Sequence, residues 1–141
     1  MYVGSGENHE GESFVGRLKV EPLVGGSAAM LHYTATSPNG RHLHREATLL
    51  ATSHNGELCL WPVMEELPVV LPHPQTRRTL LPDGGVAVVF ASGPREATET
   101  FREEITLEVK SSGEVVYAHS WGMPGGAFAE RSSCALVAAE T

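Results

Sequence analysis

The chain has 141 residues, a formal net charge of −7, and a composition that is 41% hydrophobic and 19% charged. These values are typical of a single folded domain spanning residues 1–141 and not of a disordered chain. The few basic residues are scattered along the sequence. Because nucleic acids and anionic membranes are bound by clustered Lys and Arg, we expect neither as a partner.

The start "MYVGSGENHEG" has neither a positively charged segment nor an apolar run, so we expect no signal peptide in the chain as given. No apolar stretch approaches the roughly 20 residues needed to cross a bilayer, and we expect a cytoplasmic protein. Residues 1–12 are a candidate flexible N-terminal segment. Cys59 and Cys134 are either two buried thiols or one long-range disulfide.

Turn dipeptides that contain glycine separate segments of β-type composition along the chain. These segments are 14–23, 28–36, 42–52, 57–64, 85–92, 101–110, 114–121 and 128–138. Further strands are expected in the proline-rich region 62–74, and a short helix at 94–100 is an alternative to a loop. About eight to ten short strands predict an all-β fold, a barrel or a sandwich, with little helix. The spacing of the turns is typical of an antiparallel meander.

The segment "LHYTATSPNGRHLHREATLL" predicts a hairpin around Asn39-Gly40. A three-residue loop with glycine in the left-handed region would pair Ser37 with Arg41. Counting back along both strands then places His32 opposite Glu46, with His44 on the same face.

This polar face has two interpretations. Either it faces water, or it lines the cavity of a barrel, where histidine–glutamate hydrogen bonds would satisfy buried groups. The alternation in "HLH" also places His42 and His44 on one face, and two histidines with Glu46 could hold a divalent ion.

The second predicted hairpin, "EVKSSGEVVYAH", has the same turn pattern and pairs Lys110 with Glu114. Its inner face then carries Ile105 and Leu107 together with four polar or amphipathic residues. Those four are Glu103, Tyr117, His119 and Trp121. They are either core residues that each find one hydrogen-bond partner or the lining of a small-molecule pocket.

Glycines and a proline interrupt the chain after Trp121, as at the mouth of a barrel, and Glu130-Arg131 opens the last strand. Only one of these two neighbours can point inward. An inward Arg131 would be a partner for a ligand carboxylate or for Glu103; the alternative is an exposed pair.

Sequence motifs for a nucleophile elbow, a Walker loop, a zinc protease or an EF-hand are absent. Acid–base chemistry by His119 with Glu103 is the remaining enzymatic hypothesis. We leave the question of an enzyme open and favour a non-catalytic protein.

The opening "YVGSGEN", the stretch "ATLLATSHNGELCL" and the late "SWGMPGGAFAERSS" give the chain a resemblance to bacterial fatty-acid-binding-protein-like domains of the calycin superfamily, near the nitrobindin-like branch. The resemblance implies a single antiparallel meander barrel of the calycin or lipocalin type, with roughly ten strands around a hydrophobic ligand. Nitrobindin-like domains bind haem through a late histidine, and His119 is the only position here that matches that role. The chain departs from the family pattern at Tyr2, where a tryptophan is usual, and at Gly-Gly-Ala-Phe near the end.

The sequence therefore predicts that a small, mainly hydrophobic molecule, fatty-acid-like or similar, binds inside the barrel. The candidate ligand-binding residues are Glu103, Tyr117, His119, Trp121, His32, His44, Glu46 and Arg131. Phe101, Ile105 and Leu107 would bury the apolar part of the ligand. No cofactor is predicted, with haem on His119 as the alternative. A third hypothesis is a barrel filled by side chains that self-associates as a homodimer.

Overall fold

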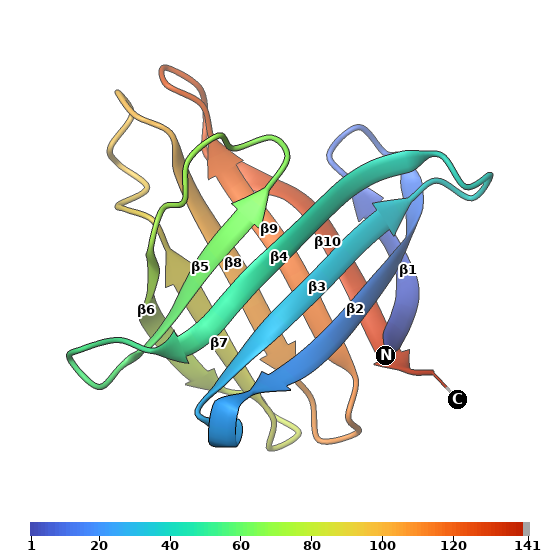
Figure 1. Cartoon of the computed structure of the whole chain (residues 1–141). Coiled ribbons are helices and arrows are strands. Elements are labelled where there is room, and N and C mark those ends of the chain that lie inside the picture. Colours follow the sequence, from blue (N-terminus) through green and yellow to red (C-terminus); the bar gives the residue numbers. More distant parts are fainter. Residues whose placement is uncertain (140–141) are drawn as a thin grey trace.

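The computed structural model describes residues 1–139, which form a closed barrel of ten antiparallel strands (Figure 1). The strands are β1 Tyr2–Asn8, β2 Ser13–Leu23, β3 Ala28–Thr36, β4 His42–Thr52, β5 Leu58–Met64, β6 His73–Leu80, β7 Val86–Ala91, β8 Arg102–Val109, β9 Val115–Gly122 and β10 Ala129–Ala138. Each strand pairs with its neighbours in the sequence, and β1 pairs with β10 to close the barrel. The prediction of an all-β meander barrel is confirmed.

β1 and β6 are the two strands that the sequence pattern did not delimit. β1 occupies most of the segment expected to be flexible, so that expectation is wrong for residues 2–8. Its glycines explain why the pattern was missed, because they leave gaps in the alternation of side chains. A Cβ at Gly4 would lie 1.8 Å from the carbonyl oxygen of Ala135, and one at Gly6 would lie 2.3 Å from the ring of Phe14. These glycines allow the close approach that closes the barrel.

Five hairpins share the three-residue loop that was predicted for two of them, and one of the five is the turn at 8–12 that joins β1 to β2. In the β3–β4 hairpin, Ser37 N–H donates to the carbonyl oxygen of Arg41 at 2.8 Å, and Gly40 has a φ of +89°. In the β8–β9 hairpin, Lys110 pairs with Glu114 in the same way. Equivalent bonds close the turns at 53–57 and 81–85. A glycine in the left-handed region therefore sets the register at each of these turns.

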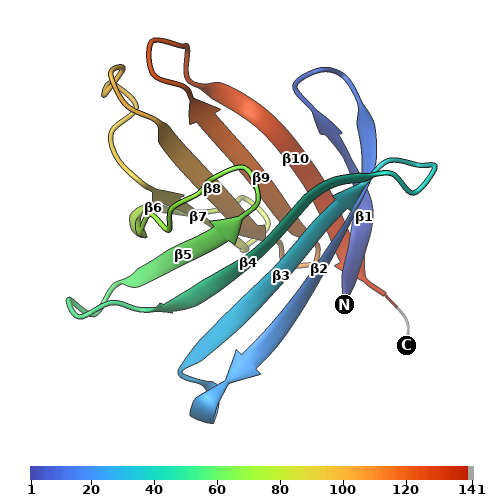
Figure 2. The same cartoon turned by 45° about the horizontal axis from the view of Figure 1, so that its top comes forward.

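The two ends of the barrel differ in their loops (Figures 1 and 2). The turns at 53–57, 81–85 and 110–114 and the 3-10 turn Val24–Gly26 lie at the end that also holds both termini. The opposite end, which we call the mouth, is surrounded by the loops 9–12, 37–41, 65–72, 92–101 and 123–128. The interior near the termini is filled by apolar side chains, including Leu18, Leu31, Leu60, Val88, Val115 and Leu136.

The mouth loops are tied together by a buried arginine. Arg102 is 2% exposed, and its guanidinium donates to the carbonyl oxygens of Arg95, Met123 and Gly126 at 3.0, 2.8 and 2.8 Å. Residues 94–100 form turns in this arrangement, and the alternative of a helix there is not observed. A charged group without water is stable here because carbonyl oxygens replace its hydration.

Cys59 and Cys134 are both buried and free, in agreement with the thiol alternative. Among the described residues, no helix is long and apolar enough to span a bilayer.

Candidate functional site

A β-bulge in β4 decides which residues of the first hairpin face the interior. Thr36 pairs with His42 as predicted, but Ala35 pairs with His44, so Leu43 is an extra residue in β4. A bulge of this kind reverses the inward and outward positions of every residue that follows it relative to the partner strand.

Beyond the bulge, Tyr33 pairs with Glu46 and His32 pairs with Ala47. The prediction that His32 lies opposite Glu46 on a shared face is therefore wrong. His32 lies on the outer surface, where its Nε2 is 3.0 Å from a carboxylate oxygen of Glu21. The inner faces combine an apolar stretch of β3 with a polar stretch of β4.

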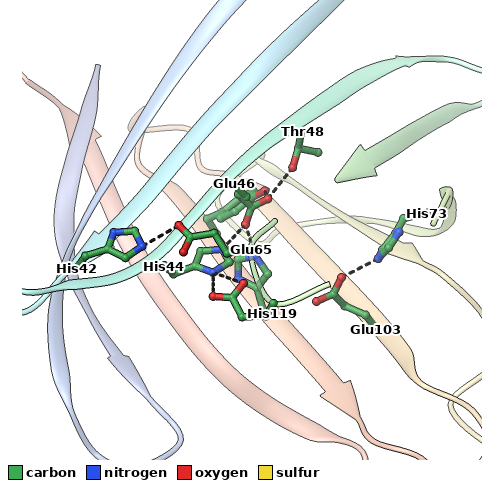
Figure 3. A network of polar contacts seen from close by, with 10 residues as sticks. His42, His44, Glu46, Thr48, Glu65, His73, Glu103 and His119 are labelled. Carbon is green, nitrogen blue, oxygen red and sulfur yellow. Dashed lines mark hydrogen bonds and ion pairs between the residues drawn. The ribbon is translucent and has the colours of Figure 1, made fainter. Parts of the chain in front are cut away.

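The inner side of β4 brings Glu46 under the cavity, where its carboxylate accepts four hydrogen bonds (Figure 3). Oε1 accepts from Nε2 of His119 at 2.7 Å and from Nε2 of His44 at 3.0 Å. Oε2 accepts from the hydroxyls of Thr48 at 2.6 Å and Tyr117 at 2.8 Å. A carboxylate with four donors is fully satisfied although its side chain is completely buried.

The surrounding groups determine the charges in this cluster, which we call the Glu46 cluster (His44, Glu46, Thr48, Tyr117 and His119). Burial alone would raise the pKa of Glu46, but the charge and hydrogen bond of His119 and those of His44 outweigh burial and hold the pKa well below its usual range.

His44 lies between two carboxylates, because its Nδ1 is 2.9 Å from Glu66 and its Nε2 faces Glu46. Burial acts to lower the pKa of His44, but the bonds and charges of Glu46 and Glu66 raise it to about 9. Burial, together with the charge of Glu46, also raises the pKa of Tyr117 well above its usual value. The cluster thus holds a buried ion pair in the metal-free protein.

A second buried pair lies on β8 and β6. Nε2 of His73 is 2.8 Å from Oε1 of Glu103, and its Nδ1 is 2.7 Å from the carbonyl oxygen of Leu71. Because a carbonyl oxygen only accepts, Nδ1 is the donor in that contact, and Nε2 faces the carboxylate. Glu103 pairs with Trp121 across the β8–β9 ladder, as predicted.

The mouth half of the barrel contains a cavity of about 260 Å³. Its apolar lining includes Phe14, Leu43, Leu67, Phe101, Trp121 and Met123. His44, Glu103 and His119 contribute polar groups to the same lining. The space therefore has apolar walls and charged or polar groups deep inside, which is the usual composition of a small-molecule site.

The predicted site residues fall into three groups. Five of them line the cavity: Glu103, His119, Trp121, His44 and Arg131. Glu46 and Tyr117 lie in the Glu46 cluster below it, and His32 lies outside the barrel. His42, the other histidine of "HLH", also points away from the cluster and pairs with Glu65 (Figure 3). Of the three apolar residues expected to bury a ligand, Phe101 lines the cavity, whereas Ile105 and Leu107 pack in or against the core.

Arg131 occupies a second bulge, because Glu130 pairs with Ser120 while Ser132 pairs with His119. Its guanidinium donates to the carbonyl oxygen of Trp121 at 3.2 Å and lies over that indole ring. Glu130 is exposed. Of the two neighbours Glu130 and Arg131, only Arg131 lines the cavity, at its rim.

Sequence reasoning missed His73 and Tyr33. His73 is flanked by prolines in "LPHPQ", which interrupt the alternation that reveals an inward position. Tyr33 points inward from β3, and the bulge in β4 places it beside His44 and His119.

The arrangement does not fit haem held through Nε2 of His119. The Nε2 of this residue is engaged with Glu46 at 2.7 Å, and iron ligation would leave a buried carboxylate without its main partner. The cavity volume of about 260 Å³ is also at the lower end for ligand pockets, which are roughly 300–1,000 Å³.

No family model and no curated protein sequence matches the chain. Among solved structures, the crystal structure of Rv2717c from M. tuberculosis is similar, with a TM-score of 0.77 and 12% sequence identity over 99% of this chain and 91% of the other. At this identity the likeness concerns the fold alone.

Proposed function

We propose that the protein binds a small, mainly apolar molecule in the cavity at the mouth of the barrel and does not transform it. The observation that carries the proposal is the cavity itself, with aromatic and aliphatic walls at Phe14, Phe101 and Trp121 and polar groups at a few fixed positions. Burial of apolar ligand surface against such walls contributes about 25 cal/mol per Å².

Two polar groups are free to orient the ligand. Oε1 of Glu103 is occupied by His73, but Oε2 has no hydrogen-bond partner within residues 1–139. Nδ1 of His119 is likewise without a partner in the same part of the chain. Both residues line the cavity, so a hydroxyl or amide group of a fatty-acid-like or similar ligand would find hydrogen-bonding atoms there.

The proposal extends to the family. The ten-stranded topology and the three sequence stretches quoted above support a calycin-like barrel near the nitrobindin-like branch of the bacterial fatty-acid-binding-protein-like domains. In keeping with it, we place the protein in the cytoplasm and allow for a homodimer that leaves the mouth accessible.

The test is a titration with the neutral fluorescent probe N-phenyl-1-naphthylamine and two alanine-to-phenylalanine variants. Ala35 lines the cavity, so Ala35→Phe fills it, whereas Ala135 is exposed on β10 and Ala135→Phe serves as the matched control. We expect saturable binding at one site, retained in Ala135→Phe and reduced at least 10-fold in Ala35→Phe. Absence of saturable binding, or equal binding in both variants, would overturn the proposal.

Addition of haem to the same sample tests the alternative. Stoichiometric uptake with a Soret band that is lost in His119→Ala would replace the apolar ligand by haem. No uptake agrees with the engagement of His119 by Glu46.

A further inference from the structure

The Glu46 cluster has a second property that the binding of an apolar molecule does not use. Three potential metal-ligating atoms, Nε2 of His44, Oε1 of Glu46 and Nε2 of His119, converge at one point and lie within 4.8 Å of one another. His44 and Glu46 are two residues apart on β4 and so share a face, and His119 meets them from β9 (Figure 3).

The outer contacts of these residues orient them as metal ligands are oriented. Nδ1–H of His44 donates to the carboxylate of Glu66, which in the neutral tautomer leaves the lone pair on Nε2, the atom that faces Glu46. Thr48 and Tyr117 donate to the other carboxylate oxygen of Glu46 and hold Oε1 toward the histidines.

The spacing suits an ion after rearrangement of the three side chains. Oε1 of Glu46 is 2.7 and 3.0 Å from the two imidazole nitrogens, and all three atoms lie within 4.8 Å of one another. Ligand atoms around a tetrahedral ion with bonds of about 2.0–2.1 Å lie roughly 3.3 Å apart. An ion in place of the two N–H protons therefore requires Oε1 to move away from the nitrogens and the two imidazoles to turn toward a common point.

We propose that His44, Glu46 and His119 form a binding site for a divalent transition-metal ion of the Zn²⁺ class at the floor of the cavity. Two imidazoles and one carboxylate suit Zn²⁺ or Co²⁺ and not Mg²⁺ or Ca²⁺, which take oxygen ligands. Because His44 and His119 line the cavity, the fourth position of the ion opens toward it and takes water or a donor atom of a bound molecule.

The first experiment uses untagged, chelator-treated protein and Co²⁺ as the probe. We expect one equivalent of Co²⁺ to give the ligand-field bands of a tetrahedral complex and one equivalent of Zn²⁺ to displace it. Absence of these bands, or an octahedral spectrum typical of a loosely bound surface ion, would overturn the proposal without recourse to any variant.

Variants then locate the ion. His44→Ala and His119→Ala are each expected to weaken Zn²⁺ binding by at least about 100-fold. Glu66→Gln, which acts through His44, is expected to weaken it by about 10–100-fold, the effect of losing an outer partner. The control is the double variant His32→Ala/His42→Ala, whose side chains lie on the outside with Glu21 and Glu65.

Thermal melting of each metal-free variant separates loss of a ligand from loss of the fold. Unchanged Zn²⁺ affinity in folded His44→Ala and His119→Ala, or equal weakening in the control, would overturn the proposal. The apolar-probe titration is done on metal-free protein, so failure of the metal site leaves the proposed function standing and failure of probe binding leaves the metal site standing.

Discussion

The interiors of the two halves of the barrel differ although the same strands form both. Toward the termini, the inner positions carry apolar side chains such as Leu31, Leu60 and Leu136, which fill the space and belong to one core with Phe90. Toward the mouth, the inner positions of β4 and β9 carry His44, Glu46 and His119, and the space above them is open.

A polar layer thus separates a filled half from a hollow half. An empty cavity inside a protein is usually lined by apolar groups. This cavity instead lies above the Glu46 cluster, whose charged and polar groups hydrogen-bond to one another. The difference indicates that the half toward the termini provides the stability of the fold, and the half toward the mouth contains the cavity in which we propose binding.

The largest expected effect of a substitution is in the filled half. Phe90 is 1% exposed and packs in the core, so Phe90→Ala should reduce the free energy of unfolding by about 3–5 kcal/mol. Chemical denaturation gives this value, and probe titration of the folded variant should show unchanged affinity. A large loss of affinity at constant fold would contradict the separation of the two halves.

The polar layer should be nearly as sensitive. Glu46→Gln keeps the size of the side chain but removes the charge that four donors share, so we expect a loss of about 3 kcal/mol. The matched control is Glu65→Gln, because Glu65 pairs with His42 on the exposed surface and should contribute less than about 1 kcal/mol. Equal losses of stability in the two variants would contradict a larger contribution of the buried carboxylate than of the exposed one.

The hollow half should show the reverse behaviour. Phe101 lines the cavity and is only half-buried, so Phe101→Ala should cost about 1 kcal/mol of stability and lower probe affinity about 10-fold or more. Denaturation and titration of the same sample check both numbers. A stability loss as large as that of Phe90→Ala would place Phe101 in the structural core instead.

The smallest effect concerns the terminal end of the barrel and depends on pH. Backbone N–H groups of Gly85 and Ser111 donate to Asp83 and hold the pKa of this carboxyl below its usual value. A lowered pKa stabilises the folded state above the unfolded pKa of about 3.9, and this stabilisation is lost as the pH falls further.

Asp83→Asn should therefore lower the melting temperature slightly at pH 7, and the difference from the wild type should disappear at the acidic end of a series of melts. A difference that stays constant with pH would show that the carboxylate charge has no part in it.

The β8–β9 hairpin was predicted residue by residue, because its glycine turn fixes the register and no bulge follows, so that Ile105 faces His119 as expected. The β3–β4 hairpin has the same turn, yet its register failed at Leu43. An extra residue at a bulge leaves the alternation of polar and apolar residues almost unchanged, so the local sequence does not indicate where the bulge lies.

The meeting of Glu46 with His119 could not be predicted from either hairpin alone. It depends on closure of the barrel, which brings β4 and β9 face to face across the interior. His119 was assigned to an inner face, whereas the direction of the face with His44 and Glu46 was left open, and the contact of Glu46 with His119 joins residues that are distant in the sequence.

The most direct test of a binding cavity at the mouth of the barrel measures the fluorescence of a tryptophan in the cavity wall. Trp121 lines it, and Trp61, the other tryptophan of the chain, is not among its lining residues. In the variant Trp61→Phe, the emission of Trp121 should change saturably with one equivalent of N-phenyl-1-naphthylamine, and the change should be lost when Ala35→Phe is added. Emission that stays constant throughout the titration, or that changes equally in the filled variant, would contradict a binding cavity at the mouth of the barrel.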